Sequence, residues 1–380
     1  MNNNNRRYSL GFIGGGLSSA VGKTHYSASQ LDGNWELVAG VFSQDPEINR
    51  ATAQAWHVQQ DRTYRTWSEL ISEERNNLDA VVVLLPTPDH QDVLCELFKA
   101  QIPVICEKAL VSSLDEIKEL SEEFNPEKNF LAVTYNYSGY PMVRELREII
   151  GSGEIGTIQQ IHFEMPQEGF VRPPDIAGKP SHPQSWRLTD QHIPTICLDL
   201  GVHLHHLAHF LTGDEPSSLI ADFENYSQYS NLVDNVRMWL RYNSGMTASF
   251  WMSKTAIGRR NGLRLRVFGD QGSAEWYQLD SEQLLISSMD GTQRIIDRGC
   301  NTYVCSQARY NRMKVGHPSG FIEAFANIYH DIAEALDEWK ANKYYSNPYV
   351  FGLRHAQNGL QLFQYARDSF DHGAWKSLDL

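Results

Sequence analysis

One segment of the chain, residues 197–213, combines a helical pattern with an aspartate and several histidines, the residue types that transfer protons near neutral pH. At 100° per residue, Asp199 and His203 lie one turn apart on the same stripe, which continues through His206 and Phe210. A carboxylate so placed can orient an imidazole and stabilise its protonated form, as general acid–base chemistry requires. We therefore expect this stripe to face a reactive site.

The other faces of this helix carry predictions of their own. Leucines form an adjacent apolar stripe that should face the core, while His205 and His209 fall on a third face predicted to be solvated. Two alternatives stay open: a histidine-rich helix that only packs beneath a sheet, and a metal site. Since the sequence offers no convincing further ligand set, we expect no bound metal. The leucines are Leu200, Leu204, Leu207 and Leu211.

A second candidate group follows the apolar run 102–106, which predicts a buried strand. Glu107 and Lys108 come directly after it. Open α/β sheets bind ligands at the carboxyl ends of their parallel strands, so this lysine is a candidate ligand-binding group. A surface ion pair between the two residues is the alternative.

The first predicted strand runs directly into a glycine-rich turn. Gly14 and Gly16 are the first two glycines of a dinucleotide-binding fingerprint, where they allow a tight turn and a close approach to a pyrophosphate. The third glycine is displaced. Either Ser19 takes its close-packing role, or the loop is about three residues longer than usual and the next glycine is Gly22.

The choice of dinucleotide depends on the end of the second predicted strand. An NAD-selective site normally has an acid there, which bonds the ribose and would repel a 2′-phosphate. This chain has Ser43, followed by Gln44 and then Asp45, so the acid is missing or shifted by two. With Arg50 nearby, the neutral Ser43 slightly favours NADP, and NAD stays open.

The elements that would position these groups fall into two patterns. Apolar runs alternate with helical segments as far as Tyr137, which is typical of βαβ units and a parallel sheet. Alternating polar and apolar strands follow, which predict a mostly antiparallel sheet with one solvated face. The fold class is thus α/β, a Rossmann doubly wound sheet followed by a C-terminal α/β domain with an open sheet. Expected strands are 10–13, 36–42, 79–85, 102–106, 130–135, 157–165, 236–242, 247–252 and 263–269, and expected helices include 114–124, 143–150, 323–339 and 353–370.

These patterns predict two domains after a short tail. Residues 1–7 begin with an asparagine run that cannot pack and should be disordered. Residues 8–137 form the predicted dinucleotide-binding domain and 138–380 the second domain, with room for its C-terminal helices to pack back on the first. The Pro- and Gly-rich segment 166–194 is predicted to lack regular structure and to be a substrate-facing loop or a plain surface excursion.

Composition excludes several classes of protein. With 41% hydrophobic residues among 380, the chain can bury a large core. No apolar run approaches the roughly 20 residues that span a bilayer, and the start lacks the apolar middle of a signal peptide, so we expect a cytoplasmic protein. The 33 basic and 46 acidic residues give a formal charge of −13, which disfavours nucleic acid and membrane partners. The five cysteines include no CxxC pair and should be reduced thiols.

In their joint order, the motifs resemble the glucose–fructose oxidoreductase, inositol dehydrogenase and rhizopine-catabolism (Gfo/Idh/MocA) family over nearly the whole chain. The resemblance implies a Rossmann domain and a C-terminal domain whose open sheet supports a substrate pocket and contacts within a homo-oligomer. Most members oxidise or reduce a sugar, cyclitol or related polyol with NAD(H) or NADP(H). The matching motifs are IGGG (13–16), TPDH (87–90), CEKAL (106–110), NYS (136–138), VRELREIIGSGEIGTI (143–158), SWRL (185–188) and DLGVH (199–203).

Carried over residue by residue, the resemblance assigns catalytic roles to three side chains. Lys108 matches the lysine of the family's Glu-Lys-Pro motif, and Asp199 and His203 match its Asp-x-x-x-His pair. In the implied mechanism His203 removes the hydroxyl proton as hydride leaves the same carbon for nicotinamide. Asp199 orients His203, and Lys108 polarises the oxygen. Some relatives give the proton transfer to the lysine instead, and the sequence does not decide between the two.

The resemblance also marks binding residues and three departures. Ala109 replaces the family proline, His206 stands where relatives often carry Asp and adds a second titrating imidazole, and the glycine loop is enlarged. Two other functions stay open, an NAD-dependent glycosidase of the same architecture and a redox-silent sensor of sugar or cofactor. Predicted substrate contacts are Tyr137, Trp186, Arg187 and His206; predicted cofactor contacts are Gly14, Gly16, Ser19, Gly22, Ser43, Gln44, Pro86, Thr87, His90, Glu107 and Lys108.

Overall fold

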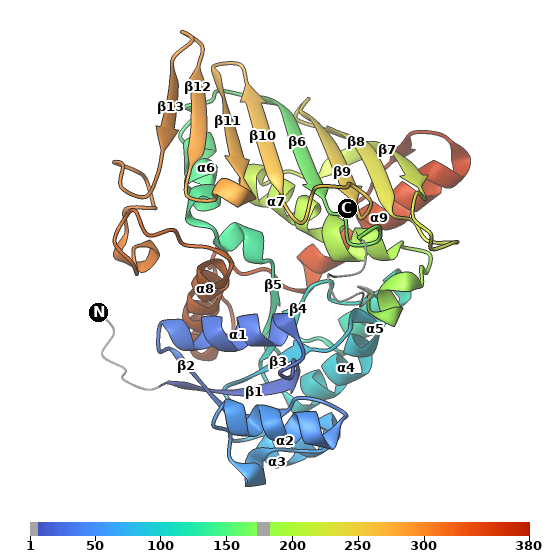
Figure 1. Ribbon diagram of the computed structural model, residues 1–380, viewed down its shortest axis with the longest axis vertical. Helices are drawn as coiled ribbons and strands as arrows, with labels where there is room; N and C mark the ends of the chain where they lie inside the picture. The colour runs from blue at the N-terminus through green and yellow to red at the C-terminus, as the bar shows by residue number, and fades with distance from the viewer. Residues whose placement is uncertain (1–6, 173–182) are drawn as a thin grey trace. The chain divides into compact units, whose positions relative to one another are not determined.

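The computed structural model describes residues 7–172 and 183–380. The asparagine run and the middle of the segment 166–194 lie outside these residues. The chain divides into two compact units, Met1–Gly139 with Gly320–Ala356 and Tyr140–Ser319 with Gln357–Leu380 (Figure 1). The first unit thus includes residues 320–356, which the predicted boundary assigned to the second domain.

A five-stranded parallel sheet forms the centre of the first unit, in the order β2-β1-β3-β4-β5. The order reverses between β1 and β3, and open α/β sheets bind ligands at the carboxyl ends of the strands beside such a reversal. The predicted doubly wound sheet is confirmed. Its elements are β1 (Tyr8–Gly14), α1 (Ala20–Leu31), β2 (Trp35–Val41), α2 (Pro46–Ala55), α3 (Trp67–Glu74), β3 (Ala80–Leu84), α4 (His90–Ala100), β4 (Val104–Glu107), α5 (Leu114–Glu123), β5 (Leu131–Thr134) and α8 (Phe321–Asn342).

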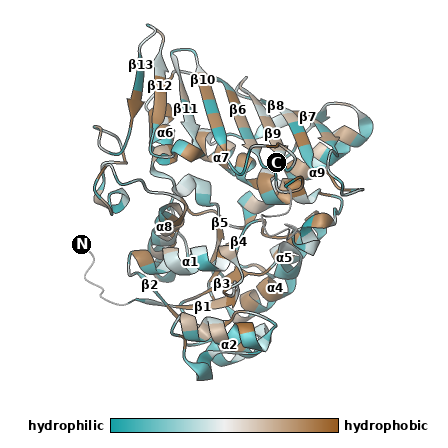
Figure 2. Cartoon of the chain, viewed as in Figure 1, coloured by the Kyte–Doolittle hydropathy of each residue, from teal (hydrophilic) through white to brown (hydrophobic). Residues whose placement is uncertain are grey.

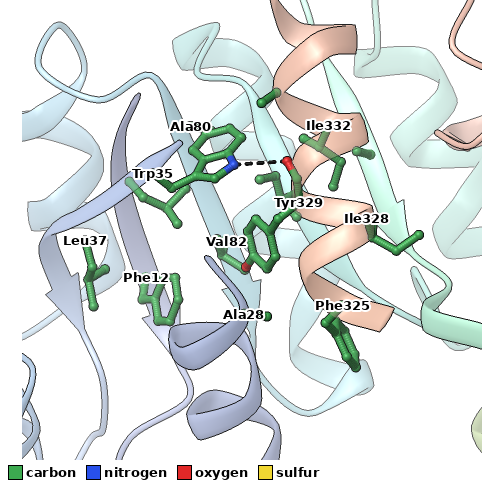
Figure 3. Close-up of a cluster of buried hydrophobic side chains, with 14 of the residues drawn as sticks. Phe12, Ala28, Trp35, Leu37, Ala80, Val82, Phe325, Ile328, Tyr329 and Ile332 are labelled. Carbon is green, nitrogen blue, oxygen red and sulfur yellow. Dashed lines mark hydrogen bonds between the residues drawn. The ribbon is translucent and has the colours of Figure 1, made fainter. Parts of the chain in front are cut away.

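Helix α8 completes the core of this unit although it lies far along the chain. The Trp35 indole N–H donates a 3.0 Å hydrogen bond to the Tyr329 carbonyl, and both side chains are buried together with Phe12 and Phe325 (Figure 3). Helix α8 also packs along α1. Because helices cover both faces of a parallel sheet, its strands must be apolar throughout, and Figure 2 shows hydrophobic residues concentrated along β1 and β3.

The second unit is built on a nine-stranded sheet in the order β13-β12-β11-β10-β6-β9-β8-β7-β14. Its neighbouring strands are antiparallel except β6 and β9, which run parallel. Strand β8 alternates buried and exposed residues, which confirms the predicted solvated face. No helix of the described residues has the length and apolar character of a membrane span. The elements are α6 (Pro141–Gly151), β6 (Ile158–Pro166), α7 (Val202–Thr212), β7 (Pro216–Glu224), β8 (Asn235–Tyr242), β9 (Thr247–Ser253), β10 (Arg264–Gly269), β11 (Gly272–Tyr277), β12 (Leu284–Ser288), β13 (Gln293–Ile296), α9 (Leu353–His372) and β14 (Lys376–Ser377).

Candidate active site

The turn after β1 has a backbone that only glycine adopts without strain. Gly14 and Gly15 have φ angles of +84° and +74°, in the left-handed region that side chains disfavour. A Cβ atom on Gly16 would lie 2.9 Å from the Phe42 carbonyl oxygen, to which the Gly16 N–H donates a 3.0 Å hydrogen bond. The bare backbone at the ends of β1 and β2 therefore suits the close approach of a pyrophosphate.

Gly22 settles which form this loop takes. A Cβ atom there would lie 1.7 Å from the Gly15 carbonyl oxygen, so Gly22 is the close-packing glycine and the loop has the longer form. Ser19 instead caps α1, its hydroxyl accepting a 3.1 Å hydrogen bond from the Gly22 N–H. Helix α1 lies within the described residues, and its first turn has no acidic residue. The positive end of the helix dipole at its N-terminus can therefore attract an anion.

The chain beyond β2 presents neutral side chains at Ser43 and Gln44. Asp45, the shifted acid, is the N-cap of α2, and its carboxylate accepts hydrogen bonds from two backbone N–H groups of that helix. Arg50 forms an exposed 2.6 Å ion pair with Glu47. The carboxylate of Asp45 thus has a local structural role in capping, and Ser43 stays the residue at which the sequence predicts the ribose contact.

His90 does not fit its predicted contact with the cofactor. Pro86 and Thr87 turn the chain after β3, and His90 then begins α4 with a fully buried ring. Its two ring nitrogens lie 2.9 and 3.0 Å from the carbonyl oxygens of Leu85 and Leu110. Burial lowers the pKa of His90. The imidazole therefore braces the β3–α4 turn against the segment that follows β4, and its side chain is not presented to a ligand.

The side chain of Glu107 points into the first unit from the end of β4. Its carboxylate accepts a hydrogen bond from Thr134 and lies 3.0 Å from His25 Nε2, while His25 Nδ1 lies 2.8 Å from the Tyr329 hydroxyl. Burial alone would raise the pKa of Glu107, but the hydrogen bond from His25 and the charges of His25 and Lys108 hold it below its ordinary value. Glu107 is thus an internal anchor for the strand end that carries Lys108.

In the second unit, Asp199 lies in a π-helical turn, Cys197–Gly201, that leads into α7. Single π-turns are rare and often occur at functional sites. Lys254 Nζ lies 2.6 Å from one carboxylate oxygen of Asp199, and the Arg187 guanidinium lies 3.6 Å from the other. The carboxylate is therefore held between two cations. Arg187 also lies over the ring of Trp186, with 4.6 Å between its guanidinium carbon and the ring centroid.

His203 and His206 are both buried on α7. Burial lowers the pKa of His206 well below its ordinary value, and the neighbouring histidines and Arg147 lower it further. Its ring stacks on Phe210, with centroids 5.8 Å apart. Both effects on its pKa disfavour the protonated form of His206, against the expectation that it adds a second titrating imidazole. Tyr137, another predicted substrate contact, is buried in the first unit.

The prediction that His205 and His209 are solvated is wrong for His205, while the side chain of His209 is partly exposed. His205 is 2% exposed, and the two rings each lie 3.1 Å from an oxygen of Glu215. Burial alone would raise the pKa of Glu215, but the hydrogen bonds from both histidines hold it well below its ordinary value. Helical periodicity could not reveal this face, because the acid that covers it lies in the turn before β7.

We expect Glu215→Gln to lower the free energy of unfolding at neutral pH by about 1–3 kcal/mol, because it removes the anion from two partly or fully buried imidazoles. Since the folded-state pKa of Glu215 is depressed, its stabilisation is present above the unfolded-state pKa and is lost as pH falls towards the folded value. Urea unfolding at several pH values should show the difference from wild type shrinking on acidification. Glu334→Gln, in an exposed pair with His330, is the control. A pH-independent difference would contradict the prediction.

Comparison with known proteins identifies the relationship. Residues 8–135 match the family described as "Oxidoreductase family, NAD-binding Rossmann fold", and residues 143–275 match "GFO/IDH/MocA C-terminal domain". The chain belongs to the Gfo/Idh/MocA family. This confirms the resemblance seen in the motifs and shows that the protein is an oxidoreductase that binds NAD or NADP through its Rossmann domain.

Relatives of this Gfo/Idh/MocA protein match it over most of their length. The crystal structure of an oxidoreductase from Sinorhizobium meliloti is 30% identical and covers 98% of this chain and 100% of its own, with a TM-score of 0.84. Uncharacterized oxidoreductase YfiI of Bacillus subtilis is 28% identical, over 86% of this chain and 84% of its own. An inositol dehydrogenase homolog from Azotobacter vinelandii, crystallised with NADH and myo-inositol, has the same fold, with 24% identity, 98% coverage of both chains and a TM-score of 0.88.

Two contacts in this Gfo/Idh/MocA protein were missed by the sequence reasoning. His25 lies three residues after the close-packing Gly22 on α1, and its buried bond to Glu107 had no signal beyond a lone histidine on a helix. Lys254 lies two residues after the run 247–252 that predicted a strand and directly follows β9. A lysine at a strand end was a visible signal, but the pairing of that strand with β6 was not.

Proposed function

We propose that this protein is an NAD(P)-dependent dehydrogenase that interconverts a hydroxyl and a ketone of a sugar, cyclitol or related polyol. The observation that carries the proposal is the glycine cradle of residues 14–22 in a chain that matches both domains of the family. The substrate class is supported by relatives named inositol 2-dehydrogenase, from Rhizobium meliloti, and levoglucosan dehydrogenase, from Pseudarthrobacter phenanthrenivorans.

Three side chains supply the acid–base chemistry in this proposal. A bound nicotinamide provides the hydride acceptor for oxidation. An imidazole nitrogen of His203 takes the proton of the reacting hydroxyl, and it returns that proton when a ketone is reduced. The anionic Asp199 stabilises the protonated imidazole, and the ammonium group of Lys108 polarises the reacting oxygen.

For the cofactor, we propose NADP over NAD. Ser43 cannot repel a 2′-phosphate, and Asp45 is engaged in capping α2. Gly14, Gly16 and Gly22 would hold the pyrophosphate against the N-terminus of α1.

Two titrations and a screen test the proposal. Fluorescence titration with NADH and with NADPH separately should show binding of both and tighter binding of NADPH. Screening polyols with the preferred oxidised cofactor should find one that drives steady reduction. Sugar release without net cofactor reduction would instead indicate the glycosidase, and cofactor binding without turnover of any substrate would indicate a sensor.

We also propose that copies of the chain associate through the open face of the nine-stranded sheet, in the cytoplasm. Trp239 of β8 is 55% exposed on this face, beside a hollow of about 310 Å³ lined by Arg237, Trp251 and Arg266 among others. Exposed aromatic and arginine side chains are typical of protein interfaces. The five cysteines, all within the described residues, are free, in keeping with a reducing compartment. Light scattering should give the mass of two or four chains.

A further inference from the structure

Two residues that no motif marked meet at one edge of the second unit's sheet. Strands β6 and β9 form its parallel pair, and their register ends at Pro166 opposite Ser253. Gln167 and Lys254 are the next residues of the two strands. Because the strands run in the same direction, both residues emerge at the same edge, as ligand-binding residues do at the carboxyl ends of parallel strands.

Lys254 lies in the interior of this unit and contacts the candidate catalytic acid. Its Nζ lies 2.6 Å from Asp199 Oδ2 and 2.7 Å from Gln167 Oε1. The lysine is 7% exposed, and the side chain of Asp199 is 11% exposed. Removing two charges from water to this degree is costly unless their geometry is good and further hydrogen bonds are made, and both conditions are met here.

The backbone on both sides of this ion pair is fixed. The Lys254 N–H donates to the Asp234 carbonyl at 2.8 Å, and the Lys254 carbonyl accepts from the Phe170 N–H at 3.0 Å. The Gln167 N–H donates to the Ser253 carbonyl at 2.7 Å. The ammonium group is thus held by a short, hydrogen-bonded segment, in contrast to the freely moving lysines of most protein surfaces.

The π-helical turn that carries Asp199 packs directly against β9. A Cβ atom on Gly201 would lie 2.5 Å from the Phe363 ring and 3.1 Å from the Met252 sulfur. Only a residue without a side chain lets the turn come so close to both. Gly201 therefore permits the approach that places the Asp199 carboxylate within reach of Lys254.

We propose that Lys254 is a positioning residue of the dehydrogenase reaction, holding the Asp199 carboxylate anionic and fixed in direction. The inference rests on the proposed role of Asp199 beside His203. Asp199 is contacted by Lys254 from the end of β9 and by Arg187 from the turn Ser185–Leu188, and His203 lies four residues further along the chain, on α7. Arg187 is the more distant cation, at 3.6 Å and partly exposed, so Lys254 contributes the stronger interaction.

Lys254→Met tests the proposal, with Lys254→Arg as the conservative variant. We expect Lys254→Met to lower kcat/KM for polyol oxidation by about 10- to 100-fold, since a buried carboxylate loses a charged hydrogen bond. When kcat/KM of Lys254→Met is plotted against pH, the acid limb of the curve should lie at higher pH than in the wild type. The reason is that a carboxylate that loses a nearby cation is protonated more easily. Lys254→Arg should restore most of the activity and the wild-type pH profile, and NADPH affinity should be unchanged in both variants.

Lys340→Met provides a matched control. Lys340 Nζ also lies 2.6 Å from a carboxylate, that of Asp79, but within the first unit. This variant should keep the wild-type pH profile even if it unfolds at a lower temperature. If Lys254→Met does not fold, Lys254→Gln can replace it in the same experiment. The glutamine keeps a polar end group but has no charge.

The results separate this inference from the proposed function. A wild-type pH profile and kcat/KM in a folded Lys254→Met or Lys254→Gln variant would overturn the positioning role, and so would an Arg variant as impaired as the neutral ones. If the wild-type protein itself oxidises no polyol, the proposed function fails, and the inference fails with it. The role of Lys254 is supported if Lys254→Met lowers kcat/KM and shifts the acid limb of its pH profile, and if Lys254→Arg restores both.

Discussion

His203→Ala is expected to lower kcat for polyol oxidation by about 10²- to 10⁴-fold, the usual contribution of a positioned general base. The proton of the reacting hydroxyl then has no imidazole to accept it. Cofactor affinity should be retained, because the glycine loop proposed to bind the pyrophosphate belongs to the first unit and His203 to the second. Steady-state kinetics and NADPH fluorescence titration measure the two effects separately.

A second histidine of the same helix controls for loss of a buried ring. His205→Ala removes one of the histidine partners of Glu215 and should reduce stability while leaving kcat nearly unchanged. Lys108→Met then shows which residue carries the proton. If Lys108→Met loses far more activity than His203→Ala, and His203→Ala stays close to wild type, the assignment of the base to His203 is wrong.

The local features of this site were predictable because they follow from short-range patterns. Apolar runs and helical periodicity predicted the two sheets, and the position of Gly14 and Gly16 after the first strand predicted the nucleotide loop. Backbone conformation resolved what spacing could not. The close approach of Gly22 to the Gly15 carbonyl shows that Gly22 is the close-packing glycine, while Ser19 is the N-cap of α1.

Long-range partners were not predictable, because no local pattern records which strands become neighbours. Lys254 follows Asp199 by 55 residues, and their contact depends on a parallel pairing in a sheet expected to be mostly antiparallel. His205 was assigned to solvent because helical periodicity shows which residues share a face but not what covers that face. The same limit hid the bond between His25 and Glu107, 82 residues apart.

Gly22→Ala should weaken NADPH binding by about 10²-fold or more, since displacing a binding group by about 1 Å can have an effect of that size. The added Cβ would lie 1.7 Å from the Gly15 carbonyl oxygen and 2.4 Å from its carbon, and both neighbouring atoms are backbone. No side-chain rotation can relieve such a contact. Either α1 moves away from the loop or the Gly15 peptide turns, and each change removes N–H groups from the place where they would meet the pyrophosphate.

The free energy of unfolding should fall as well, by about 1–3 kcal/mol, as for other overpacked sites. Gly33→Ala is the control, because Gly33 follows the same helix and an added Cβ there would meet no atom within 4 Å, although its φ of +69° disfavours any side chain. It should lose about 1–2 kcal/mol through backbone strain alone and bind NADPH as wild type does. Equal affinities in the two variants would show that the 14–22 loop does not hold the dinucleotide, because both substitutions destabilise the chain but only the clash at Gly22 distorts that loop.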